Sequence, residues 1–285
     1  MTPLDKRSPT SSPIPIGNQT GFSAPTPTYP FEYALRAGFD AFEFFPDVRE
    51  DTGQGFREAD LDAATRANIH NLAVGHGVRL SVHAPWWIDP LIPGALDELA
   101  ETQRFALDLG ARVMVVHLYL QQGVDAYVEA VLPLIERLAR EGQRLAMENT
   151  VVTGPDEVNA VFAEVQRRGP ALFGSYGLCL DIGHANLCEA TRNDYLAFVD
   201  RLDTSVPLIH AHLHENWGDA DTHLPLFSGP AGENPAGVCG LLDRLIARDY
   251  HGALILEQWP DPPELLDRAC SQLREILAAR GVAAV

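Results

Sequence analysis

Hydrophobic and polar positions along the chain follow two patterns that alternate from one end to the other. Short runs with apolar residues on both faces are separated by longer stretches in which apolar residues recur at helical spacing, such as Leu61, Ile69 and Leu72. The short runs predict strands, the first of which has the weakest pattern. They cover residues 13–17, 39–45, 78–83, 112–117, 144–148, 176–181, 208–212 and 254–257.

The longer stretches predict helices, and several of them end at a glycine. These glycines are Gly38, Gly77, Gly110, Gly142 and Gly169. Glycine most readily adopts the left-handed conformation that ends a helix and turns the chain into the next strand. Later helices are predicted near residues 195–202, 241–247 and 263–280.

Strands that are apolar on both faces and alternate with helices indicate a parallel sheet covered by helices. Eight such units fit the length of a (β/α)8 TIM barrel, so we expect an α/β protein with a single barrel domain over residues 13–285. Residues 1–12, rich in Pro and Ser, are expected to form a flexible tail. The alternative is an open doubly wound sheet. It would require a glycine-rich phosphate loop, and the sequence contains neither GxGxxG nor GxxxxGKS/T.

The charge balance limits the class of partner. The chain has 39 acidic and 21 basic residues, a net charge of −18, and no basic cluster larger than Arg167-Arg168. Because phosphate backbones require a basic footprint, duplex nucleic acid is not expected as a partner. The first residues contain no apolar segment of the secretory type, so no secretory signal is expected, and no apolar run approaches the ~20 residues of a membrane helix. The four cysteines show no CxxC pairing and are interpreted as free thiols, so we expect a cytoplasmic protein.

Most of the predicted strands end in a residue that can bind a metal or transfer a proton. In chain order these residues are Glu43, His83, His117, Glu148, Asp181, His212 and Glu257. In a barrel such strand ends converge on one mouth, where active sites are built. Carboxylates and imidazoles crowded there would repel one another without a cation. Their oxygen and nitrogen atoms suit Zn²⁺ or Mn²⁺, with Mg²⁺ or Co²⁺ as alternatives.

The predicted seventh strand opens into residues 209–225, a segment that holds four of the ten histidines. Because side chains alternate along a strand, His210, His212 and His214 are expected on one face. Such a face fits a divalent metal. The competing interpretation is a hydrogen-bonded core histidine followed by a polar loop.

An ordered set of short segments carries a resemblance to a known family. The segments are His83-Ala-Pro, Val-Val-His117, Met-Glu148-Asn-Thr, Leu-Asp181-Ile-Gly-His184, His212-Leu-His-Glu-Asn216, Asp221-Thr-His223-Leu-Pro and Leu-Glu257. In these the chain resembles the xylose-isomerase-like barrel superfamily over roughly residues 13–280. That superfamily joins sugar and sugar-phosphate isomerases and epimerases with endonuclease IV.

The resemblance implies a metal site made by Glu148, Asp181, His212 and Glu257. It also implies that His184 lies beside the substrate or ligates a second metal. In the nuclease branch, the remaining ligand positions of a three-zinc cluster correspond to His83, His117, Asp221 and His223. In the isomerase branch one metal is usual, and these outer residues contact the substrate. His210 is then expected to be a core residue. His214 is expected either in the loop or behind the metal ligands, and Glu43 either behind the ligands or as a structural residue.

The function expected from this set is a metal-dependent isomerase or epimerase of a sugar or sugar phosphate. It would transfer a proton through a metal-stabilised enediolate, with Glu148 and Glu257 as base and acid and His184 polarising a substrate oxygen. Trp86 and Trp87 are candidates for stacking on the substrate, with loop packing as the alternative. Asn149 is a further candidate substrate contact.

The rival expectation is a phosphodiester hydrolase of the endonuclease IV type that acts on a small or non-duplex substrate. A third is an inactive barrel that serves as a binding module. Some sugar epimerases of this superfamily place an Arg shortly after the seventh strand, and residues 216–226 contain no Lys or Arg. The partner is expected to be a small molecule, a carbohydrate by this resemblance, with no membrane contact. A homo-oligomer is compatible with such a barrel, although no sequence feature fixes an interface.

Overall fold

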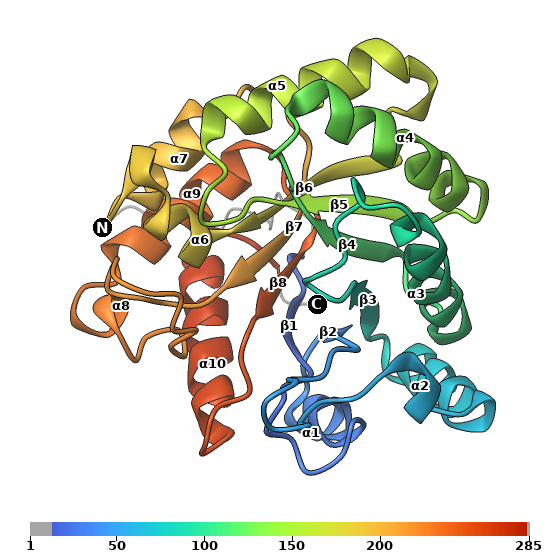
Figure 1. Cartoon of the computed structure of the whole chain (residues 1–285). Helices are drawn as coiled ribbons and strands as arrows, with labels where there is room; N and C mark the ends of the chain where they lie inside the picture. Colours follow the sequence, from blue (N-terminus) through green and yellow to red (C-terminus); the bar gives the residue numbers. More distant parts are fainter. Residues whose placement is uncertain (1–12, 284–285) are drawn as a thin grey trace.

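The computed structural model describes residues 13–283 and confirms the (β/α)8 barrel. Eight parallel strands pair in chain order, and β8 closes on β1 (Figure 1). The strands are β1 (Ile16–Gln19), β2 (Ala41–Phe44), β3 (Arg79–His83), β4 (Val113–His117), β5 (Arg144–Glu148), β6 (Tyr176–Asp181), β7 (Leu208–Leu213) and β8 (Ala253–Leu256). The tail expected over residues 1–12 lies outside the described residues.

Helices form a ring around the strands (Figure 1). They are α1 (Tyr29–Ala37), α2 (Ala63–His76), α3 (Ala95–Leu109), α4 (Val124–Arg140), α5 (Pro155–Arg168), α6 (Ile182–Leu187), α7 (Tyr195–Arg201), α8 (Pro230–Glu233), α9 (Ala236–Ala247) and α10 (Glu264–Ala278). Two helices, α6 and α7, connect β6 to β7, and α8 and α9 connect β7 to β8. Short 3-10 turns lie at Glu58–Asp60, Pro170–Leu172 and Glu189–Thr191.

The first strand lies further along the chain than predicted, at Ile16–Gln19 instead of 13–17. Its last residues, Asn18 and Gln19, are polar but buried, and the hydrophobic pattern therefore misses them. Gly17 is required because a Cβ there would lie 2.3 Å from the carbonyl oxygen of Ala41 on β2.

The predicted glycine caps are left-handed at four of the five positions. Gly38, Gly77 and Gly110 follow α1, α2 and α3 directly with φ of 71°, 71° and 75°, and Gly142 has φ of 69°. At Gly169 the prediction is wrong, since φ is −125°. The next residue is Pro170, and a residue before proline favours extended backbone over helix.

The barrel interior becomes polar toward the carboxyl ends of the strands. The neighbouring strand residues Val115, Ala146 and Cys179 form a small apolar cluster, separate from the larger core between strands and helices. Closer to the carboxyl ends, Glu148 and His212 are fully buried. Burying such groups is unfavourable unless they are paired or bind a cation, so their position requires an explanation.

All four cysteines are free thiols, which agrees with the sequence interpretation. Among residues 13–283, no helix combines the length and the apolar character that crossing a bilayer demands.

Candidate metal centre

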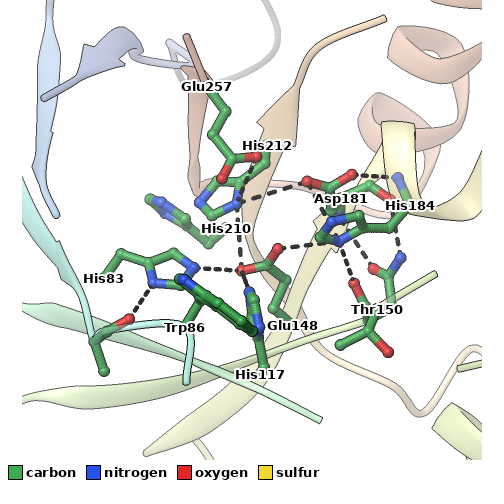
Figure 2. Close-up of polar contacts among 12 residues, drawn as sticks. His83, Trp86, His117, Glu148, Thr150, Asp181, His184, His210, His212 and Glu257 are labelled. Carbon is green, nitrogen blue, oxygen red and sulfur yellow. Dashed lines mark hydrogen bonds and ion pairs between the residues drawn. The ribbon is translucent and has the colours of Figure 1, made fainter. Parts of the chain in front are cut away.

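The residues predicted to form one metal site converge at the carboxyl ends of β5 to β8 (Figure 2). Nδ1 of His212 lies 3.4 Å from Oε2 of Glu148, 3.4 Å from Oε2 of Glu257 and 3.9 Å from Oδ2 of Asp181. The parallel register contributes directly, because Asp181 on β6 is the pairing partner of His212 on β7. Three carboxylates thus surround one imidazole nitrogen.

Several of these buried atoms have no hydrogen-bond partner among residues 13–283. They include Nδ1 of His212, Oε1 of Glu148 and Oε2 of Glu257. Leaving buried polar atoms unpaired is costly, and a divalent cation would satisfy them together. The donor set of carboxylate oxygens and imidazole nitrogen fits Zn²⁺ or Mn²⁺.

His83 and His117 extend this group through Glu148. Nε2 of His83 lies 2.8 Å, and Nε2 of His117 3.6 Å, from Oε2 of Glu148. One donor atom each from His83, Glu148, His212 and Glu257 falls within 4.8 Å of the others. Asp181 belongs instead to overlapping groups, one with Glu148 and His184 and one with His214 and Glu257. The predicted ligands Glu148, His212 and Glu257 thus share one group, whereas Asp181 does not. The prediction that Asp181 binds the same ion therefore has weaker geometric support.

A second cluster, made by His184, His214, Asp221 and His223, adjoins the first. Oδ2 of Asp221 lies 3.2 Å from Nε2 of His184 and 3.3 Å from Nε2 of His223. The rings of His214 and His223 stack in parallel with centroids 3.9 Å apart. Three of the residues that the sequence assigns to a second metal or to substrate, His184, Asp221 and His223, thus come together in this cluster, whereas His83 and His117 lie beside Glu148 in the first group.

Of the two positions expected for His214, the structure has the one behind a predicted metal ligand and not the open loop. His214 lies directly after β7, is buried, and its Nε2 is 3.1 Å from both carboxylate oxygens of Asp181. The alternation of His210, His212 and His214 is the sequence signal for this position. The polar residues that follow His214 obscure that signal, because they resemble a loop.

Glu43 of β2 lies beneath the centre and contacts two histidines of β7. Its Oε1 is 2.9 Å from Nε2 of His212, at ion-pair distance but without hydrogen-bond geometry. Its Oε2 is 2.9 Å from Nε2 of His210 and accepts a hydrogen bond of 2.8 Å from Ser81 Oγ. Because Nε2 of His212 faces Glu43, its Nδ1 is left to face the carboxylates above. His210 is a buried, hydrogen-bonded residue, as expected.

Asn149 holds the backbone instead of lining the mouth. Its amide donates to the carbonyl of Asp181 at 2.9 Å and accepts from the backbone N–H of Asp181 at 2.9 Å. The side chain is fully buried. The structure therefore places Asn149 where it positions Asp181, which differs from the substrate contact expected from the sequence.

The crowding of carboxylates perturbs their protonation. Burial, with added repulsion from Asp181 and Glu148, raises the pKa of Glu257 to about 8 against the opposing effect of His212. Burial would also raise the pKa of Glu148, but the surrounding histidines, led by His212, lower it well below its usual range. Two carboxyl groups of one buried cluster thus have pKa values shifted in opposite directions, a common arrangement for acid and base partners.

In the second cluster, Asp221 and the histidines shift one another. Burial opposes the shift, but His184 and His223 lower the pKa of Asp221. The pKa of His223 rises to about 9, because hydrogen bonding to Asp221 outweighs the effect of burial.

A cavity of about 520 Å³ opens above these residues. Its floor includes His83, His117, His184, Asp221, His223 and Glu257, and its walls carry Gln19, Thr20, Ser23, Gln54, Thr222 and Gln258 with the aromatic rings of Phe22, Phe45, Trp86 and Trp259. Trp86 is 57% exposed and faces this space. Trp87 does not line it, and its Nε1 donates to Asp47 at 3.2 Å.

Arg49 is a cavity residue that the sequence interpretation missed. It is the one Lys or Arg among the described residues that line this cavity. Arg49 follows β2 in a loop, and its guanidinium lies 5.0 Å from the ring centre of Phe22. No local motif marks it, because Arg49 reaches the cavity through the meeting of its loop with Phe22 in the loop after β1.

Comparisons with known proteins agree with this architecture. The family model described as xylose isomerase-like TIM barrel matches residues 31–276. An uncharacterised protein of Methanocaldococcus jannaschii, MJ1311, is 25% identical over 205 residues, which are 63% of this chain. The match spans 64% of the length of that relative.

Solved structures with the same fold include enzymes of both kinds expected from the sequence. A D-tagatose 3-epimerase-like protein has a TM-score of 0.73 at 20% identity, covering 93% of this chain and 98% of its own. Endonuclease IV from Thermus thermophilus has a TM-score of 0.67 at 23% identity, covering 93% and 99%. An L-ribulose 3-epimerase has a TM-score of 0.66 at 17% identity, covering 93% and 95%. At these identities the likeness shows the fold.

Proposed function

Because the chain belongs to the xylose isomerase-like TIM barrel family, we propose that it is a divalent-metal-dependent isomerase or epimerase of a sugar or sugar phosphate. The observation that carries this proposal is the lining of the mouth cavity. Amide and hydroxyl groups that suit sugar hydroxyls stand beside aromatic rings that suit a sugar face. Gln19 and Gln258 also keep buried side-chain atoms without a partner among residues 13–283, which leaves them available to a polyhydroxy ligand.

The chemistry follows from two carboxylates that reach the centre from different strands. Isomerisation or epimerisation removes a proton from a carbon beside a carbonyl and returns it elsewhere. We assign these transfers to Glu148 on β5 and Glu257 after β8, with His184 hydrogen-bonding a substrate oxygen from the cavity floor. The same carboxylates with Asp181 and His212 would hold Zn²⁺ or Mn²⁺, which stabilises negative charge on the substrate oxygens.

Proton exchange tests this proposal even while the product is unidentified. We expect that the protein, supplied with Mn²⁺ or Zn²⁺ and a free ketose such as tagatose or ribulose in D₂O, will introduce deuterium beside the carbonyl, as read by NMR. Glu148→Gln and Glu257→Gln should abolish the exchange. Glu233→Gln, an exposed position on α8, is the matched control and should retain it. Metal-loaded protein that exchanges no proton in any ketose would contradict the proposal.

The second cluster favours one other candidate function, a phosphodiester hydrolase with more than one metal. Asp221 is within 3.3 Å of both His184 and His223, as a ligand of an additional ion would be. Metal stoichiometry separates the candidates. One ion per chain supports the isomerase, whereas two or three ions that are lost on His223→Ala, with cleavage of a small phosphodiester, support the hydrolase.

A further inference from the structure

A second cavity, of about 410 Å³, lies at the amino ends of the strands, opposite the mouth. Its wall carries three arginines, each at the start of a strand: Arg79 on β3, Arg112 directly before β4 and Arg144 on β5. His70 and His251 also line it, and His210 is part of its lining from β7. No Asp or Glu is among the described residues that line it, although the chain as a whole carries a net charge of −18.

These arginines have no acidic partner among the described residues, in contrast to some of the arginines at the outer helices. Arg244 pairs with Asp200 at 2.6 Å, and Arg280 pairs with Asp243 at 2.6 Å. Within residues 13–283, by contrast, Arg79, Arg112 and Arg144 form no ion pair with any carboxylate. Asp249, two residues before the lining residue His251, lies 3.3 Å from Nε2 of that histidine.

Arg144 has the least access to compensating water. Its Nε is buried without a partner among the described residues, and its other guanidinium nitrogens make no hydrogen bond to them. Arg79 and Arg112 are exposed, and Arg79 donates to the carbonyl of His251 at 3.2 Å. Solvation alone accounts for the two exposed arginines. It does not account for a half-buried guanidinium that faces a cavity together with two like charges.

We propose that this basal cavity binds a small anion bearing a phosphate group, held by Arg79, Arg112 and Arg144. Guanidinium groups supply forked N–H donors that match phosphate oxygens, and several of them together neutralise a dianion. A volume of about 410 Å³ leaves room for more than the phosphate group, so a phosphate monoester would also fit. The site does not depend on the proposed isomerase function, because its residues are separate from the predicted ligands.

Calorimetric titration of the purified full-length protein with inorganic phosphate tests the site. We expect saturable binding that weakens about tenfold or more in Arg144→Gln, since a charge-assisted hydrogen bond is lost. Arg112→Gln, at an exposed position, should weaken it as well, and it keeps the test valid if Arg144→Gln unfolds. Arg49→Gln, in the mouth, is the matched control and should leave this binding unchanged. An absence of saturable binding, or binding that falls in Arg49→Gln and persists in both basal variants, would overturn the proposal.

Discussion

Replacing Glu43 with Gln separates the role of this residue in holding His212 from its role in the core. The carboxylate faces Nε2 of His212 and Nε2 of His210, each at 2.9 Å, and accepts the hydroxyl of Ser81. Glutamine keeps the volume but removes the charge, and it replaces one acceptor oxygen with a donor. The imidazole that faces the new amide NH₂ group therefore loses its acceptor. When that imidazole is His212, its Nδ1 is no longer held toward the carboxylates above it.

The expected magnitude follows from what outer partners of metal ligands contribute. Changing such a partner typically costs 10–100-fold in metal affinity, which corresponds to about 1.4–2.8 kcal/mol. The folded state should also be destabilised, by at most the ~3–5 kcal/mol associated with breaking a buried pair. Burial opposes ionisation of Glu43, yet His212 and His210 lower its pKa, which indicates that the carboxylate is charged and that Gln removes a real charge.

The assay is competition between the protein and a metal-binding dye, read for Zn²⁺ and Mn²⁺, with thermal unfolding measured alongside. Ser81→Ala is the matched control, because it removes the third contact of Glu43 and leaves both imidazoles in place. It should cost about 1 kcal/mol of stability and change metal affinity little. Glu43→Gln that keeps wild-type metal affinity while losing stability would show that Glu43 serves the core alone and refute this reasoning.

Three further outcomes follow from the centre. Glu148→Ala should lose the bound metal in elemental analysis, and an unchanged metal content would remove the central assignment. Because the pKa of Glu257 is raised to about 8 by burial and neighbouring carboxylates, the metal-free protein holds a proton there at pH 7. Metal uptake should therefore release protons, and affinity should rise with pH up to about 8; calorimetry in buffers of different ionisation enthalpy that detects no release would contradict this. Trp86→Ala should raise KM for the proposed sugar substrate more than it lowers kcat, since its exposed ring lines the cavity. Trp87 does not line the cavity. Changes in KM and kcat of Trp87→Ala that equal those of Trp86→Ala would therefore indicate that both rings serve loop packing.

The sequence predicts the barrel well because periodicity, helix-ending glycines and strand spacing all depend on local residues. The predictions fail where a residue's environment is set by distant chain. The first strand is predicted too early because Asn18 and Gln19 are buried only once β1 pairs with β2 and β8. Gly169 departs from the left-handed cap because its conformation is set by the following proline.

For the candidate site, the sequence predicts which residues converge but not all of their contacts. Each acidic or histidine residue at a strand end can be identified from its own strand alone. Because the strands are parallel, their ends then lie on one face of the barrel. The placement of Arg49 in the mouth depends on how two loops meet in the closed barrel. The hydrogen bonds of Asn149 to Asp181 depend on the pairing of β5 with β6. Neither is encoded in spacing along the chain.

The two halves of the barrel contribute different parts of the centre, as the contact between Glu43 and β7 shows. All four predicted metal ligands come from β5 to β8, the second half of the chain. The carboxylate that faces His212 comes from β2, and its hydrogen bond to His210 joins residues 167 positions apart. A fragment that contained only the second half would carry the complete predicted ligand set without the group that orients its histidine. Fragment complementation between the halves would therefore report, through recovered metal affinity, on closure of the barrel itself.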